Sequence, residues 1–269
     1  MTDRPTELDR VREYEEENYR MSTEQLLGPA ANLSPEAVEL YEVMTSIAVS
    51  GPAKIGGDDI LALSFLTACK YELTMASLDV LRCHLLASYP HTRRALELCA
   101  FAARIKNDLA RVNLWLDASK DEQAYWKYWN EFRPTEVFPK NHPILSRLYQ
   151  RYTDCSRLSH PSVYSLALQT SIKQNLKTTD VRVEYFQAEE DGSDVARTFL
   201  WTIDTHFLIL LVFQDEVMQD LLANDPKRWA IRRDAFEAQL ATQKSRFRSL
   251  VHPAKKPAPG TTPTLIWTP

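Results

Sequence analysis

The sequence predicts an all-α protein, an antiparallel helical bundle with at most one short strand or hairpin. Only six glycines occur in 269 residues, and many of the fifteen prolines fall where helices should begin or end. Apolar residues recur at helical spacing through most of the chain. The one run that alternates as a strand does, 181–187, is short.

The first helices follow from charge pattern and capping residues. Residues 5–27 have the composition of a charged surface helix, with a break expected near Met21. Ser34 is placed to cap the next helix, because Pro35 follows it at the first helical position, and Gly51 ends that helix.

The next two segments predict a helical hairpin. Residues 60–86 carry apolar side chains nearly all round, which indicates a central, mostly buried helix. Pro90 should separate it from a second long helix over 91–118. The short connection predicts that the two helices run antiparallel.

The second half of the chain is less regular. A shorter aromatic helix over 120–132 and an irregular stretch, PTEVFPKNHP, precede a helix at 143–159. Another helix is expected to run to Lys177, and the strand at 181–187 follows it. Helices at 194–223 and 226–250 complete the fold.

These elements predict three parts of the chain. Residues 1–30 form a charged N-terminal helical arm, and residues 31–250 form a single bundle domain. Residues 251–269 are rich in proline and predict a flexible tail.

The composition of the chain says more about the cellular location of the protein than about its partner. With 32 Lys plus Arg against 36 Asp plus Glu, the net charge of -4 gives no global attraction to nucleic acid or to an anionic membrane. The strongest apolar run, Phe207 to Phe213, is far shorter than the ~20 residues of a membrane span. The charged N-terminus has no secretory signal, so we expect a cytoplasmic protein without a membrane partner. Its four cysteines should be reduced core residues.

Two polar signatures stand out in helical, otherwise apolar sequence. HTRRALE holds Arg93 and Glu97, and YTDCSRLSHPS holds Tyr152, Ser156 and His160. In each signature the polar residues are four apart and share one helix face. A buried polar cluster needs partners, so the two signatures are candidates to be each other's partners.

Each signature has a structural and a functional interpretation. Glu97 is either half of a solvated pair with Arg93 or a buried structural acid. His160 either stabilises the carboxyl end of its helix or acts as a general acid or base oriented by Ser156 or Glu97. The candidate catalytic set is therefore Arg93, Glu97, Ser156 and His160.

Patterns for metals, phosphates and cofactors are weak. His84 and His91 are seven residues apart with Pro90 between them, and the chain has no H-E-x-x-H motif. Neither a phosphate-binding loop nor a dinucleotide fingerprint is present in the sequence. We therefore predict neither a metal nor another cofactor.

Two further patterns leave alternatives open. The aromatic residues of 125–132 either pack as core or interface residues or stack on nucleotide bases. Asp204 and His206 lie in an apolar helix, where they are either satisfied core groups or part of the same polar cluster as His160.

One basic segment near the C-terminus has a spacing suited to RNA. Arg246 is followed by five residues and then His252, in a setting rich in Lys and Arg. A cation and a histidine two turns apart near a helix end suit phosphate binding and proton transfer. The alternative is a solvated basic helix.

The order of these features resembles a known family. A helix with R-x-x-x-E, then Y-x-x-x-S-x-x-x-H-P, a short strand and a long apolar helix are similar to the DUF5677-like bacterial helical proteins over about residues 35–220. These are distantly similar to the HEPN superfamily, which includes dimeric, metal-independent RNases with an Arg, four to six residues, then His. Around His160 the chain departs from that spacing, and Arg246 with His252 fits it outside the resemblance.

The resemblance implies a HEPN-like bundle and a homodimer. The function predicted is a binding or interaction module in bacterial defence or stress response, with RNA or a protein as its partner. The alternative is a HEPN-type metal-independent RNase toxin, and the residues leave open whether the protein is an enzyme.

Overall fold

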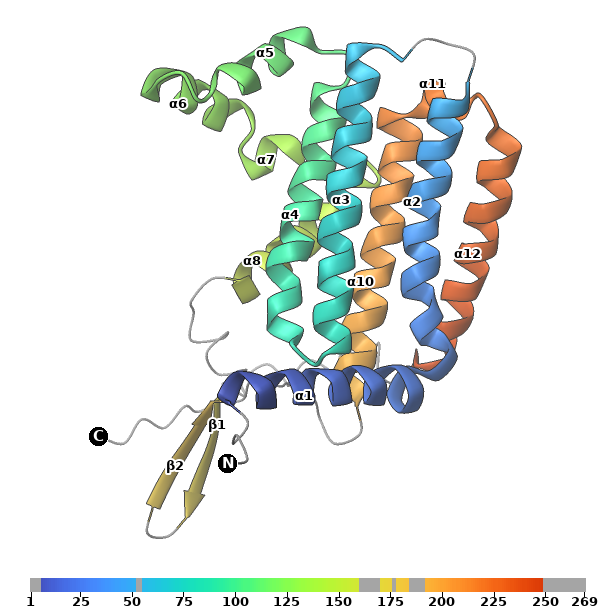
Figure 1. The fold of residues 1–269 in the computed structure, drawn as a ribbon. Coiled ribbons are helices and arrows are strands. Elements are labelled where there is room, and N and C mark those ends of the chain that lie inside the picture. Colours follow the sequence, from blue (N-terminus) through green and yellow to red (C-terminus); the bar gives the residue numbers. More distant parts are fainter. Residues whose placement is uncertain (1–5, 52–54, 160–169, 176–177, 184–191, 249–269) are drawn as a thin grey trace.

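The computed structural model describes residues 6–51, 55–159, 170–175, 178–183 and 192–248. Long helices stand side by side and form the body of the molecule (Figure 1). These helices are α2 (Leu33–Ser50), α3 (Gly57–Leu81), α4 (Leu85–Ile105), α10 (Ser193–Val212) and α12 (Pro226–Arg246). The predicted all-α helical bundle is confirmed.

Helix α10, not the helix predicted over 60–86, is the most deeply buried element. Fifteen of its 20 residues are buried, and it contacts α2, α3, α4, α12 and α8 (Leu145–Ser159). Helix α3 buries only ten of its 25 residues. Its outer face leaves Ile60 58% and Tyr71 59% exposed. The prediction was wrong because apolar residues on all sides of a helix do not ensure that every side meets another element.

The turn between α3 and α4 lies earlier than Pro90. Cys83 has a φ of 63°, and its amide donates to the carbonyl of Val80 at 3.0 Å, which closes the turn. Pro90 lies inside α4, one turn beyond its start. The hairpin is as predicted, but its boundary was wrong because a left-handed residue rather than the proline reverses the chain.

The predicted helix over 91–118 is interrupted as well. Helix α4 ends at Ile105, Asn107 has a φ of 59°, and α5 (Leu109–Asp117) begins after Asp108. The side chain of Asp108 accepts a hydrogen bond from the amide of Arg111 at 3.1 Å and caps α5. Figure 1 shows α5, α6 (Glu122–Glu131) and α7 (Pro134–Val137) as an arm beside α4. The arm therefore departs from the bundle at a capped break.

The N-terminal segment changes helix type where a break was expected. Helix α1 (Glu7–Arg20) has no buried residue and lies across one end of the bundle (Figure 1). It continues as a π-helix, η1 (Met21–Leu27), and a 3₁₀-helix, η2 (Gly28–Asn32). Because η2 leads straight into α2 at Leu33, Ser34 is not the N-cap residue that the sequence indicated.

The strand prediction was partly right. Strands β1 (Thr170–Asn175) and β2 (Thr178–Val183) form an antiparallel hairpin, with Thr170 opposite Val183. The helix expected to run to Lys177 is wrong over 170–175. A second strand supplies the backbone partners that a lone strand lacks. Residues 184–187 of the predicted strand lie outside the described residues.

The C-terminal helices follow the pattern with one interruption. After α10 the chain forms a π-helix, η3 (Phe213–Val217), and a short helix, α11 (Gln219–Leu222), instead of one helix to residue 223. Helix α12 begins at Pro226, and the side chain of Asp225 accepts from the amide of Arg228 at 3.1 Å. The proline and the cap mark this start as the sequence rules require.

One described segment is long and apolar enough to cross a membrane, Ser193–Val217, and 78% of its most apolar window is buried inside the bundle. Such burial fits the core helix of a soluble protein. All four cysteines are free and buried in that core, as expected, at positions 69, 83, 99 and 155.

Candidate functional site

The first polar signature forms an ion pair on α4. Nε of Arg93 donates to Oε1 of Glu97 at 3.1 Å, with the two side chains 26% and 45% exposed. Glu97 therefore has the Arg partner considered for it, but it is not a buried acid. Nearly half of its side chain remains accessible.

The two signatures meet through Arg93 and Tyr152. Nη2 of Arg93 donates to the Tyr152 hydroxyl at 3.3 Å, and the guanidinium lies 5.3 Å from the centre of the Tyr152 ring. Burial acts to lower the pKa of Arg93, but Glu97 and Tyr152 outweigh it and the net shift is upward. Arg93 therefore stays charged and links α4 to α8.

The other two members of the predicted catalytic set do not join this contact. The Ser156 hydroxyl donates to the backbone carbonyl of Tyr152 in its own helix at 2.8 Å. Such a bond to the preceding turn is common for serine in helices. His160 lies outside the described residues.

A cavity of about 330 Å³ opens beside the Arg93–Glu97 pair. Helix α4 supplies its polar edge, and aromatic side chains supply most of its wall. Its size is at the lower end of the range of small-molecule sites, roughly 300–1,000 Å³, which are also mainly apolar with a few polar groups. We call this feature the aromatic cavity.

The wall of the aromatic cavity is built by ring contacts between the bundle and the arm. The ring of Phe101 on α4 lies 4.5 Å from that of Phe132 and 5.7 Å from that of Trp115. On the α8 side, the rings of Phe138 and Tyr152 are 5.3 Å apart. These separations are typical of packed aromatic pairs, so the wall is held by its own contacts.

An ion pair fixes the arm that carries half of this wall. Nε of Arg111 on α5 donates to Oε1 of Glu131 on α6 at 2.8 Å, and its Nη1 donates to the carbonyl of Arg104 at 3.4 Å. The arginine therefore ties α5 and α6 to the end of α4. This positions the rings of α6 against the bundle.

The aromatic helix divides into packed and accessible residues. Tyr128 and Phe132 lie against each other with ring centres 5.2 Å apart, whereas Trp126 is 51% and Trp129 is 46% exposed. Trp129 lines the aromatic cavity and Trp126 does not. The packing expected from the helical spacing therefore holds for Tyr128 and Phe132, whereas Trp126 and Trp129 remain accessible.

Tyr128 contributes a protonated hydroxyl close to Glu97. Burial raises the pKa of Tyr128, and the negative charges of Glu97 and ionised Tyr125 add to the increase. At neutral pH its hydroxyl therefore remains a hydrogen-bond donor. The polar edge of the cavity thus combines a carboxylate with phenol groups.

The predicted RNA-binding pair is only half described. Nη1 of Arg246 donates to the carbonyl of Leu27 at 3.5 Å, and its guanidinium lies 5.0 Å from the ring centre of Phe247. These contacts hold Arg246 against the N-terminal segment. His252 lies outside the described residues.

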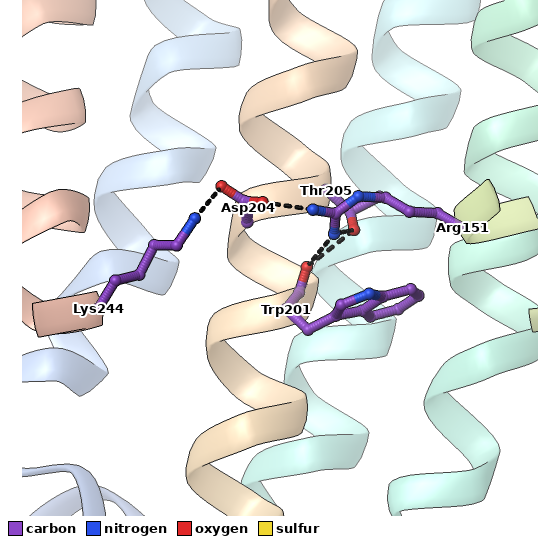
Figure 2. A network of polar contacts seen from close by, with 5 residues as sticks. All are labelled: Arg151, Trp201, Asp204, Thr205 and Lys244. Carbon is purple, nitrogen blue, oxygen red and sulfur yellow. Dashed lines mark hydrogen bonds and ion pairs between the residues drawn. The ribbon is translucent and has the colours of Figure 1, made fainter. Parts of the chain in front are cut away.

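A second polar network, which the sequence did not reveal, runs across α10 and links it to the helices on either side (Figure 2). Asp204 on α10 pairs with Arg151 on α8 through Oδ2, and its Oδ1 accepts from Nζ of Lys244 on α12 at 2.9 Å. Nη1 of Arg151 also donates to Thr205 Oγ1 at 2.6 Å and to the Trp201 carbonyl at 3.0 Å. One carboxylate thus joins three helices.

This network is called the clamp and is defined as Arg151, Asp204 and Lys244. Its Arg151–Asp204 pair is more deeply buried than the Arg93–Glu97 pair, whereas Lys244 reaches Asp204 from the surface. The side chains of Arg151 and Asp204 are each only 15% exposed. Burial lowers the pKa of Arg151, although Asp204 opposes the effect. The structure supports the interpretation of Asp204 as a satisfied core group. An acid in an apolar helix predicts a cationic partner, but the sequence cannot say which cation reaches it.

His206, two residues further along α10, lies in a different environment. It is 1% exposed, and its ring packs edge-on against Tyr41 with centres 5.9 Å apart. Burial lowers its pKa to about 3, with a small opposing effect from the Leu73 backbone. Within the described residues neither ring nitrogen makes a hydrogen bond of regular geometry. His206 is therefore a neutral core residue.

The remaining histidines considered for a metal pair with carboxylates. Nε2 of His84 lies 3.0 Å from Glu15, and Nδ1 of His91 lies 2.7 Å from Glu72. No group of three or more His, Cys, Asp or Glu residues suited to a metal ion occurs in the described part of the chain.

Comparison of the chain with models of protein families, with curated proteins and with solved structures finds no match. The resemblance to DUF5677-like and HEPN proteins therefore stays a prediction. The aromatic cavity and the clamp are the features of the described residues that bear on function.

Proposed function

We propose that the protein is a binding module that holds a small, flat ligand in the aromatic cavity. The observation that carries this proposal is a 330 Å³ cavity with an aromatic wall and the Arg93–Glu97 pair on its edge. A mainly apolar cavity with a few convergent polar groups is the general form of a small-molecule site.

The exposure of the lining side chains supports the proposal. Trp129 is 46% exposed at the cavity, and the Glu97 side chain is 45% exposed. Large aromatic surface left in contact with water favours binding of another flat group, which would remove that surface from solvent. The arm is already tied to α4 through Arg111, so the cavity does not have to be assembled by the ligand.

Saturation-transfer NMR with indole and purine riboside as probes tests the proposal. Both are flat aromatic molecules, and we expect wild-type protein to transfer magnetisation to them. Trp129→Ala should weaken the transfer strongly because it removes part of the cavity wall. Trp126→Ala is the matched control on the same helix, since this similarly exposed residue does not line the cavity. Equal signals from the two variants, or none from the wild type, would disprove the proposal.

A metal-independent RNase remains the alternative function. It rests on the spacing of Arg246 and His252 and on His160, and both histidines lie outside the described residues. RNA cleavage by purified protein without added metal tests it. Loss of cleavage in His160→Ala or His252→Ala, at matched folding, would support the RNase and locate its site.

The biological setting is proposed from the resemblance alone. Similarity to DUF5677-like proteins favours a role in bacterial defence or stress response, with RNA or a protein as partner. The same resemblance favours a homodimer. Light scattering coupled to size-exclusion chromatography tests the oligomeric state directly.

A further inference from the structure

We propose that the ligand of the aromatic cavity is a heteroaromatic ring that carries adjacent N–H groups, such as guanine, and that Glu97 accepts them. This inference rests on the proposed function and adds the chemical class of the ligand. It comes from the position of Glu97 at the edge of an aromatic wall.

Glu97 can accept hydrogen bonds from a ligand in addition to the one from Arg93. Arg93 donates to Oε1 of Glu97 at 3.1 Å. A carboxylate has about four acceptor positions on its two oxygens, so Glu97 can accept further N–H donors while it remains paired. Its side chain is 45% exposed, and so a ligand can approach it without first displacing the protein.

The local charge separates this class of ligand from a simple cation. Arg93 neutralises Glu97 and itself stays charged, because Glu97 and Tyr152 outweigh the effect of burial on its pKa. A second cation would gain little from a carboxylate that is already paired and would lie near a guanidinium. A neutral N–H donor meets no such repulsion and still makes a charge-assisted hydrogen bond.

The aromatic wall supplies the remaining recognition. Trp129 and Tyr128 come from α6 and Tyr152 from α8, so rings from two elements line the cavity beside Glu97. Stacking of a base on such side chains contributes to affinity and depends little on which base is bound. Stacking therefore supplies affinity for flat rings, and Glu97 selects those with N–H groups.

Guanine fits both requirements. Its ring N–H and exocyclic amine point in the same direction, and together they can donate two parallel hydrogen bonds to one carboxylate. Purine riboside has the same ring system without these donors. 1-Methylguanosine replaces the ring N–H by a methyl group.

Isothermal titration calorimetry with guanosine, 1-methylguanosine and purine riboside tests the inference. Guanosine should bind wild-type protein at least tenfold more tightly than either analogue, the ratio that corresponds to about 1.4 kcal/mol. Glu97→Gln should remove this preference, so that guanosine binds no more tightly than purine riboside does. Trp129→Ala should weaken all three, and Trp126→Ala should weaken none.

The outcomes separate this inference from the proposed function. Equal binding of the three nucleosides, or guanosine binding unchanged by Glu97→Gln, would overturn the inference while the cavity remained a site for flat ligands. No binding of any nucleoside, together with no NMR signal from indole, would overturn both. Thermal melting of each variant confirms that the binding differences come from folded protein.

Discussion

The Arg93–Glu97 pair and the Arg151–Asp204–Lys244 clamp use the same kinds of charged group in opposite surroundings. The pair lies at the edge of a cavity, with side chains 26% and 45% exposed. In the clamp, Arg151 and Asp204 are each 15% exposed and the carboxylate contacts two cations from two other helices. The Glu97 carboxylate therefore remains accessible, whereas both oxygens of the Asp204 carboxylate are paired with protein cations.

Burial and the number of charged partners distinguish a binding group from a structural group. A surface ion pair contributes only about 0–1 kcal/mol, so the pair can be changed without losing the fold. Breaking a buried pair leaves an uncompensated charge in a low-dielectric interior. We therefore expect changes to the clamp to affect stability and changes to the pair to affect ligand binding.

The largest effect is expected for Asp204→Asn. The variant leaves Arg151 buried without its carboxylate, and stability should fall by about 3 kcal/mol. Urea unfolding followed by circular dichroism measures the loss. Glu39→Gln is the matched control, because Glu39 pairs with Arg232 at the surface and should cost no more than about 0.5 kcal/mol. Equal losses in the two variants would contradict the account of the clamp.

The next largest effect is expected in the pH dependence of stability, to which His206 contributes. Burial holds the pKa of His206 at about 3 in the folded state, below the value of 6.5 that is ordinary for histidine. Between these values the unfolded chain binds a proton that the folded protein does not, so stability falls as the pH falls. The free energy of unfolding therefore decreases between pH 7 and pH 5. His206→Leu should make this decrease about 2 kcal/mol smaller.

Urea unfolding of both proteins at the two pH values measures this difference. The carboxylates titrate alike in both, so they cancel in the comparison. An identical pH dependence would show that His206 takes up its proton in the folded protein as readily as in the unfolded chain. The contrast with Asp204 on the same helix would then disappear, because an unpaired buried charge would be tolerated there.

A smaller effect on stability is expected at the cavity edge. Arg93→Ala removes one exposed ion pair and the contact with the Tyr152 ring, so we expect a loss of about 1 kcal/mol. Thermal unfolding measures it. A loss as large as that of Asp204→Asn would make the Arg93–Glu97 pair a second structural clamp.

The smallest effect is expected for Ser156→Ala. The Ser156 hydroxyl bonds the carbonyl of Tyr152 in its own helix, and stability should change by no more than about 0.5 kcal/mol. Nucleoside binding, measured by calorimetry, should also be unchanged. Loss of binding in a stable Ser156→Ala protein would bring this residue back into the site.

Local sequence signals predicted the parts of the fold that depend on local chemistry. The start of α12 follows from Asp225 and Pro226, and the 143–159 pattern agrees with α8 within two residues at its start. The break between α3 and α4 was misplaced because Cys83, in a left-handed conformation, reverses the chain before Pro90. The hairpin at 170–183 was missed because strand pairing joins two segments that single-segment periodicity treats separately.

Local sequence patterns likewise predict only those polar contacts that form within one helix. The four-residue spacing identified Arg93 with Glu97, because such a pair is a property of one helix. The clamp needs α8, α10 and α12 to meet at Asp204, which no local pattern specifies. The aromatic cavity likewise requires the arm to fold back on α4, so its aromatic residues were visible in the sequence but their common wall was not.

The central claim is that the aromatic cavity binds a ligand and the clamp stabilises the fold. The most direct test is to measure melting temperature and purine riboside affinity on the same samples of Trp129→Ala and Asp204→Asn. We expect Trp129→Ala to lose affinity and to melt as the wild type does. We expect Asp204→Asn to melt at a much lower temperature but to bind normally at temperatures where it is folded. Normal binding by Trp129→Ala, or a melting temperature as low as that of Asp204→Asn, would contradict the account.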